Sequence, residues 1–123
     1  MAISKEQLKK RFERKTKTVT VEGDELALRM PSPLEWSRYQ SSLIDPKTGK
    51  GDLSRLGVAQ MMLVASMLVG DDGRPLVDNY AELDGLDAAY YEQIKDECIS
   101  FATGGKFDQE AKKVLGESEE TPS

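Results

Sequence analysis

Histidine is missing from this chain of 123 residues, and cysteine occurs once, at Cys98. Histidine is the commonest general base and the commonest metal ligand, so its absence removes the usual catalytic and metal-binding chemistry. A single cysteine excludes an intramolecular disulfide and fits a cytosolic protein. No CxxC or HExxH motif occurs, and residues 48–51 (TGKG) lack the glycine spacing of a phosphate-binding loop. We therefore expect a protein that is not an enzyme, with no catalytic residue, no cofactor and no metal.

No apolar run is long enough to cross a membrane, which takes roughly 20 residues. The longest covers residues 58–69 (VAQMMLVASMLV), where only Gln60 and Ser66 are polar, and extending it backwards meets Gly57 and Arg55. The basic N-terminus is not followed by the apolar stretch of a signal peptide. We expect a cytoplasmic protein that does not enter the membrane.

Positive charge is in deficit, because 22 acidic residues outnumber 17 basic ones and the formal net charge is -5. This balance argues against general binding to nucleic acid. The charge is unevenly spread. The start is basic, with Glu6 and Glu13 against Lys5, Lys9, Lys10, Arg11, Arg14, Lys15 and Lys17. The end is acidic, with Lys112 and Lys113 against Asp108, Glu110, Glu117, Glu119 and Glu120. The two ends can touch within or between molecules, or both can simply be solvated.

Residues 1–15 predict a basic helical arm. Ser4 followed by Gln7 fits a capping box at its start. Ile3, Leu8 and Phe12 form only a thin apolar stripe, which is too small to hold the segment in place by itself. We expect a flexible arm, either as a mobile end or as a helix that docks on a partner.

Residues 16–30 predict a β-hairpin, because apolar and polar residues alternate on both sides of Gly23. We expect a two-residue turn at Gly23 and Asp24, with positive φ at Gly23. One face of the hairpin carries Val19, Val21, Leu26, Leu28 and Met30. A two-stranded ribbon is marginal in water, so this face must lie on the helices that follow or pair with another copy.

Four helices are expected after the hairpin, over about residues 33–44, 52–69, 80–85 and 88–102. Ser32, Pro33 and Glu35 form the clearest start, with a cap, a proline at the first position and a glutamate that reaches back. The second helix is apolar nearly all round, so it is buried on every side or shares one side with a partner. Cys98 lies on the apolar stripe of the last helix and is expected to be a buried residue, not a nucleophile.

Together these elements predict an α+β fold that is mainly α, in which an N-terminal β-hairpin precedes a small bundle of about four helices. A single globular domain is expected over residues 16–103. Residues 104–123 contain few apolar residues, and we expect them to form a disordered acidic tail.

Three stretches carry a resemblance to a known family: residues 17–30 (KTVTVEGDELALRM), residues 32–36 (SPLEW) and residues 68–76 (LVGDDGRPL). In this order and spacing the chain resembles the tail assembly chaperones of long-tailed (siphovirus-type) bacteriophages and prophages. Members begin with a hairpin that ends in an arginine. They continue with a helix opened by a Ser/Pro cap, and they carry an Asp-Gly turn followed by a basic residue and Pro-Leu. The resemblance covers about residues 16–103.

The resemblance implies a non-enzymatic role in virion assembly. Such chaperones bind the long tape measure protein in the host cytoplasm and keep it soluble until the tail tube polymerises around it, and they are absent from the finished virion. Many are also made in a longer form by a programmed ribosomal frameshift, and the extension recruits the tail tube protein. This chain would be the shorter form, with slip sites at residues 105–106 or 111–113. Self-association is also expected.

A chaperone of this kind needs apolar surface that is exposed or shared between copies. The candidate partner-binding residues are Trp36, Tyr39, Met61, Met62 and Leu68, together with the outer face of the hairpin. A helix-in-groove contact is expected, because the tape measure protein should be largely helical. Two other classes stay open: a small regulatory or adaptor domain that binds a helical peptide, and a minor structural virion protein such as a head–tail connector.

Overall fold

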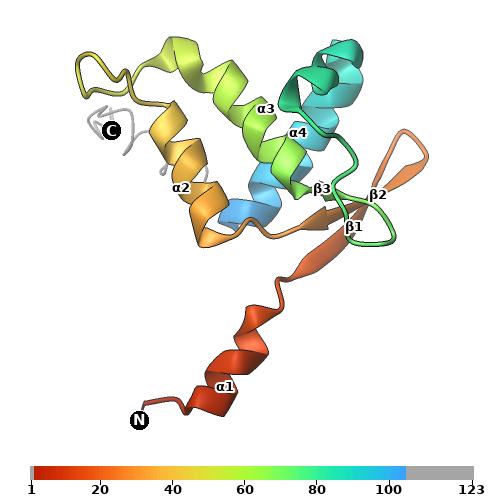
Figure 1. Ribbon diagram of the computed structural model, residues 1–123. Coiled ribbons are helices and arrows are strands. Elements are labelled where there is room, and N and C mark those ends of the chain that lie inside the picture. The colour runs from red at the N-terminus through yellow and green to blue at the C-terminus, as the bar shows by residue number, and fades with distance from the viewer. Residues whose placement is uncertain (1, 105–123) are drawn as a thin grey trace, which may run out of the picture.

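The computed structural model describes residues 2–104 as three longer helices packed on a small sheet, with a short helix projecting from them (Figure 1). In chain order the elements are α1 (Lys5–Lys9), the 3-10 helix η1 (Lys10–Phe12), β1 (Thr16–Val21), β2 (Asp24–Arg29), α2 (Pro33–Ser42), η2 (Leu53–Arg55), α3 (Leu56–Met67), β3 (Leu68–Val69), η3 (Tyr80–Gly85) and α4 (Ala88–Thr103). The predicted class, α+β and mainly α with an N-terminal hairpin, is confirmed. The disorder predicted for the acidic tail lies outside the described residues. Within residues 2–104, no helix combines the length and the apolar character that crossing a bilayer requires.

The hairpin gains a third strand that the sequence did not indicate. β1, β2 and β3 form an antiparallel sheet in that order, with Leu28 opposite Leu68 and Ala27 opposite Val69. The prediction of one helix over residues 52–69 is therefore wrong at both ends, because residues 53–55 form a 3-10 helix and residues 68–69 a strand. Leu68 and Val69 are apolar, so they fit either a helix or a strand. The free edge of β2 supplies the backbone partners that decide between them.

The hairpin turn lies one residue earlier than predicted. Val21 pairs with Asp24, so the loop residues are Glu22 and Gly23, not Gly23 and Asp24. Both have positive φ, 51° at Glu22 and 86° at Gly23, as in the type I′ turn of tight hairpins. Positive φ at Gly23 is as predicted, whereas at Glu22 it strains a residue that carries a Cβ atom.

Replacing Glu22 by asparagine is expected to raise the free energy of unfolding by about 1 kcal/mol, because asparagine adopts the left-handed conformation more readily. Glu22 Oε2 accepts a 2.7 Å hydrogen bond from Gln93 Nε2, which the substitution removes. Gln93→Ala loses the same bond without altering the turn and serves as the matched control. Chemical denaturation compares the variants, and a Glu22→Asn protein no more stable than Gln93→Ala contradicts the argument.

Helix α3 lies at the centre of the helical body. α2, α4, η3 and β2 all contact it (Figure 1). Leu63, Val64 and Met67 of α3 are buried, and they join Leu28 of the sheet and Cys98 of α4 in one apolar core. Most of the apolar surface of this helix is therefore covered from within the chain.

The apolar face of the hairpin packs on the helices, as predicted. Val19, Val21 and Leu28 are buried in the same core as α3 and α4. At the turn end of this face, Asp24 Oδ2 accepts a 2.7 Å hydrogen bond from Tyr90 Oη in the first turn of α4. The sheet and α4 are therefore joined by both apolar and polar contacts.

The predicted start of α2 is confirmed by its capping hydrogen bonds. Ser32 Oγ accepts a hydrogen bond from Glu35 N at 3.1 Å, Glu35 Oε1 accepts one from Ser32 N at 3.0 Å, and Pro33 occupies the first position. α2 ends at Ser42 and α4 at Thr103, close to the expected ends. Residues 80–85 are helical as predicted, but in the tighter 3-10 form.

Candidate functional site

The five predicted partner-binding residues come from three elements. Trp36 and Tyr39 lie on α2, Met61 and Met62 on α3, and Leu68 on β3. Tyr39 is 3% exposed and Leu68 is 4% exposed, so neither offers free surface in the isolated chain. Trp36, Met61 and Met62 are half-buried. Contact between Leu68 and a partner would require β3 to leave the sheet.

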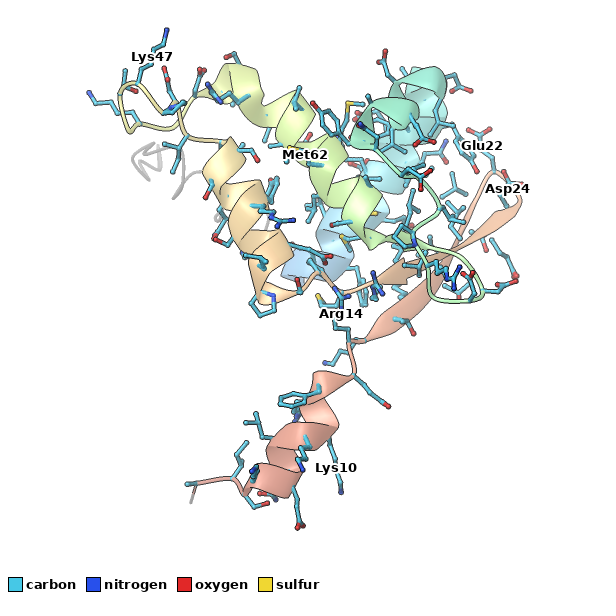
Figure 2. The ribbon with its side chains drawn as sticks, in the orientation of Figure 1. Lys10, Arg14, Glu22, Asp24, Lys47 and Met62 are labelled. Atoms are coloured by element: carbon cyan, nitrogen blue, oxygen red, sulfur yellow. The ribbon has the colours of Figure 1, made fainter. Side chains whose placement is uncertain are left out.

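A groove of about 390 Å³ lies beside α3, between α2 and the chain that follows β3. We call it the central groove. It is lined by Glu35, Arg38, Tyr39, Met62, Leu63, Ala65, Ser66, Pro75, Val77, Asp78, Asn79 and Tyr80. Tyr39 and Leu63 are its buried members, and Arg38 and Asp78 are exposed. Met62 Sδ lies 3.8 Å from Ser42 Oγ at the end of α2, so Met62 bridges the two helices beside the groove (Figure 2).

Met61 lies at a different groove. Consecutive residues of an α-helix point about 100° apart, so Met61 and Met62 do not share a face of α3. The second groove measures about 440 Å³ and is lined by Ser54, Gly57, Val58, Gln60, Met61, Leu83, Asp84, Leu86, Ala88, Tyr91 and Glu92. The predicted set therefore divides, with Tyr39 and Met62 at the central groove and Met61 at the second. Trp36 and Leu68 line neither of these two grooves.

The outer face of the hairpin, the remaining sequence-derived candidate, is polar. Thr18, Thr20 and Glu25 lie on it and are exposed. Large exposed apolar side chains occur elsewhere, in the arm (Ile3, Leu8 and Phe12) and on the body (Leu34, Leu53, Val58, Leu76, Tyr80 and Leu86). The grooves and the arm therefore offer more apolar surface for contact with a partner than the outer face of the sheet does.

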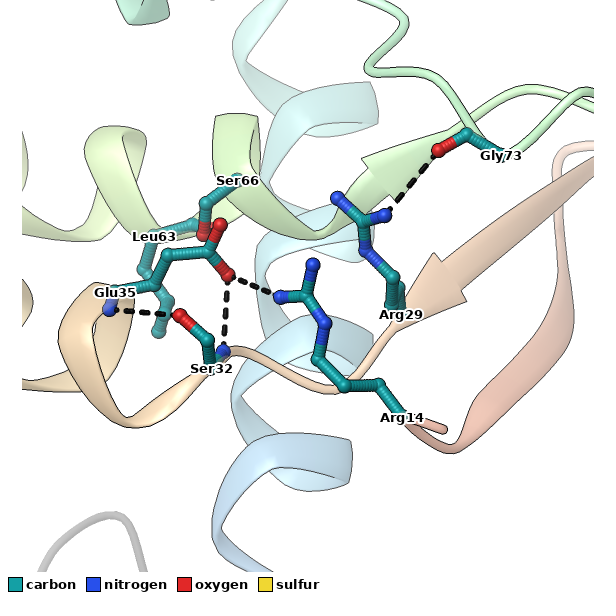
Figure 3. Close-up of polar contacts among 7 residues, drawn as sticks. All are labelled: Arg14, Arg29, Ser32, Glu35, Leu63, Ser66 and Gly73. Carbon is teal, nitrogen blue, oxygen red and sulfur yellow. Dashed lines mark hydrogen bonds and ion pairs between the residues drawn. The ribbon is translucent and has the colours of Figure 1, made fainter. Parts of the chain in front are cut away.

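Arg14 links the arm to α2. Its Nη1 donates a 2.7 Å hydrogen bond to Glu35 Oε1, the same oxygen that accepts from Ser32 N in the helix cap (Figure 3). A hollow of about 490 Å³ lies beside this contact, which we call the basic hollow. It is lined by Lys10, Arg11, Glu13, Arg14, Lys15, Met30, Pro31, Ser32 and Pro33. Sequence reasoning found the basic arm and the Ser32 cap separately, but no local pattern connects Arg14 with a residue 21 positions later.

Two of the sequence features that carry the family resemblance meet in the structure. Arg29, at the end of the hairpin, donates from Nη1 to the carbonyl oxygen of Gly73 at 3.2 Å (Figure 3). Gly73 lies in the Asp-Gly turn after β3 and has φ of 79°. The arginine of β2 therefore contacts the turn that follows β3, and Pro75 beyond this turn forms an isolated bridge with Val69 of β3.

The ionisable groups of the core are neutral at physiological pH. Burial raises the pKa of the Cys98 thiol to about 12, and it raises the pKa of the Tyr91 phenol to about 12. Burial also raises the pKa of Tyr39, whose ring lies 5.1 Å from that of Trp36. Cys98 is therefore not a thiolate at neutral pH and lacks the reactivity of a nucleophile. Among residues 2–104, no three His, Cys, Asp or Glu side chains are grouped to hold a metal ion.

No family model matches the sequence, and no curated protein matches it. The structure is similar to that of the bacteriophage HK97 tail assembly chaperone. The match covers 84% of this chain and 84% of that chain, with 22% sequence identity and a TM-score of 0.41.

Proposed function

We propose that this chain is a tail assembly chaperone of a long-tailed bacteriophage or prophage. In this role it binds the tape measure protein in the host cytoplasm, keeps it soluble and assists polymerisation of the tail tube around it, without entering the finished virion. The sequence support is the resemblance of residues 17–30, 32–36 and 68–76 to that family. The structural observation that carries the proposal is the central groove beside α3.

The central groove has the properties that an amphipathic helix requires of its binding site. Tyr39 and Leu63 give it a buried apolar lining, against which a helix can place its apolar stripe. Met62 adds an unbranched side chain that adapts to different apolar partners, which suits a long client with many similar helices. Arg38 and Asp78 carry opposite charges at the exposed margin and can pair with polar flanks of the client helix.

The proposal includes a longer product made by frameshifting, which recruits the tail tube protein. Both candidate slip positions, residues 105–106 and 111–113, follow the end of α4. A change of reading frame there leaves the sequence of residues 2–104 unaltered, so both products carry the same groove. Self-association is also part of the proposal, and the exposed Val58 and Leu86 at the second groove provide apolar surface for it.

Co-expression with the tape measure protein encoded nearby is expected to raise the soluble fraction of that protein several-fold. Met62→Glu places a charge in the central groove and should abolish most of this gain. Tyr80→Ser removes an exposed aromatic ring from the margin of the groove and should reduce the gain without threatening the fold. The measurement is the amount of tape measure protein in the soluble fraction, with pull-down of the complex.

Leu53→Ser is the matched control, because Leu53 is exposed on the body but lines neither groove. Thermal unfolding of each variant confirms that it is folded before its activity is compared. If wild type leaves the tape measure protein as insoluble as it is alone, the chaperone function is wrong. If wild type, Met62→Glu and Tyr80→Ser all solubilise it equally, the function stands and the central groove is not the client site.

A further inference from the structure

The arm and the basic hollow form a surface whose charge is largely unpaired. Arg14 is engaged by Glu35 across 2.7 Å. Within residues 2–104, no ion pair involves Lys10, Arg11 or Lys15, and all three side chains are exposed (Figure 2 labels Lys10). Three positive charges, against the one carboxylate of Glu13, are thus concentrated on one short segment of an otherwise acidic chain.

The same segment exposes apolar surface. Phe12 is 70% exposed and Leu8 is 47% exposed, and the two are four residues apart in the continuous helical stretch of α1 and η1. This stretch projects from the body (Figure 1). A helix this short is marginal in water unless something packs against it, because nucleation is unfavourable. A ligand for this surface should therefore carry both negative charge and apolar side chains.

The chain leaves α4 close to this surface. Lys17, two residues after Lys15, has its Nζ 4.0 Å from Glu97 Oε1 and 6.0 Å from the centre of the Phe101 ring. Both partners belong to the last turns of α4, which ends at Thr103. Figure 1 shows this end of α4 on the side of the body from which the arm projects. The last residues that the structure describes therefore lie on the side of the body from which the arm projects.

The sequence after residue 104 contains a segment of the required chemistry. Residues 114–120 read VLGESEE, so two apolar residues are followed by Glu117, Glu119 and Glu120. The 13 residue-to-residue steps from Gly104 to Glu117 can span up to about 45 Å when extended, at roughly 3.3–3.6 Å per residue. This reach is several times the diameter of a helix, which is about 10–12 Å.

We propose that the basic hollow and the arm bind residues 114–120 of the same chain. Glu117, Glu119 and Glu120 pair with Lys10, Arg11 and Lys15, and Val114 and Leu115 pack on Leu8 and Phe12. The contact needs no client and goes beyond the chaperone role. If the chaperone role is correct, this contact also distinguishes the shorter product from the frameshifted one. Both slip positions precede Glu117, so the frameshifted chain loses the acidic segment.

Paramagnetic relaxation enhancement in the full chain tests the contact. A nitroxide is attached through Ser118→Cys, and the native Cys98 stays unmodified because its side chain is fully buried. The amide signals of residues 8–15, Met30 and Ser32 are expected to lose most of their intensity. The loss should disappear at about 1 M salt, where the Debye length falls to about 3 Å. It should also disappear in Lys10→Glu/Lys15→Glu.

Lys47→Glu/Lys50→Glu is the matched control, because it makes the same charge change in an exposed loop away from the arm (Figure 2 labels Lys47). It should leave the broadening as strong as in wild type. A sample mixing spin-labelled chains with isotope-labelled, unmodified chains reports contacts between molecules. Broadening in that sample overturns the proposal in favour of a second copy. Absence of broadening in wild type, or its persistence in Lys10→Glu/Lys15→Glu, also overturns it. None of these outcomes depends on the tape measure protein.

Discussion

Shortening Leu28 to alanine is expected to lower the free energy of unfolding by about 3 kcal/mol, within the roughly 2–5 kcal/mol typical of buried leucines. Leu28 is 0% exposed and lies on β2, the middle strand of the sheet. It pairs in register with Lys17 on one side and Leu68 on the other. The substitution removes apolar contacts and leaves a cavity that strands on both sides keep from collapsing.

Leu34→Ala is the matched control for this prediction. Leu34 lies in the first turn of α2 and is 62% exposed, so its loss removes the same atoms without opening a cavity. The expected change is within about 0.5 kcal/mol of wild type. Urea denaturation of the three proteins measures both effects. If Leu28→Ala and Leu34→Ala lower the free energy of unfolding equally, the sheet does not form part of the core.

The free energy of unfolding is expected to fall as the pH rises above about 9, because buried groups resist losing their protons. The pKa of Cys98 rises from an ordinary value of 9.0 to about 12 on burial. Between these values the unfolded chain loses the thiol proton and the folded chain keeps it, so rising pH favours unfolding. One such group contributes a slope of about 1.4 kcal/mol per pH unit. Above the folded pKa this contribution is lost in full.

Cys98→Ala isolates this contribution. The variant lacks the thiol, so its stability should stay nearly level between about pH 9 and 10, where wild type already declines. Above about pH 10 both proteins should decline, because burial also raises the pKa of Tyr39 and Tyr91. The small cavity left by the alanine lowers stability equally at every pH, so the slopes are compared. Parallel curves for the two proteins would contradict burial of the thiol.

Thiol modification gives an independent measurement of the same property. At pH 8 a thiol with a pKa of about 12 is ionised on the order of a thousand-fold less than one with the ordinary pKa of 9.0. The native protein is expected to react with a disulfide reagent at least that much more slowly than the protein in guanidinium. Fast reaction of the native protein would place Cys98 at the surface.

The candidate site was only partly predictable. Met62 and Tyr39 are expected from the sequence to be partner-binding residues on apolar or amphipathic helices, and both line one groove. Met61 satisfies the same criterion but lies at another groove, because one step along a helix turns a side chain by about 100°. The sequence predicts Leu68 on a helix face, but in the structure it belongs to strand β3. Sequence pattern identifies the residues that must be covered, but not the element that covers each one.

The local elements of this protein were determined by the sequence itself. The alternation around Gly23 defines the hairpin, and the Ser32–Glu35 box defines the start of α2, because both depend on hydrogen bonds and side-chain directions within a few residues. Long-range partners were decided only by the tertiary structure. β3 forms because β2 offers it a free edge, and the basic hollow forms because Arg14 reaches Glu35. Such contacts depend on how whole elements pack, which no short stretch of sequence specifies.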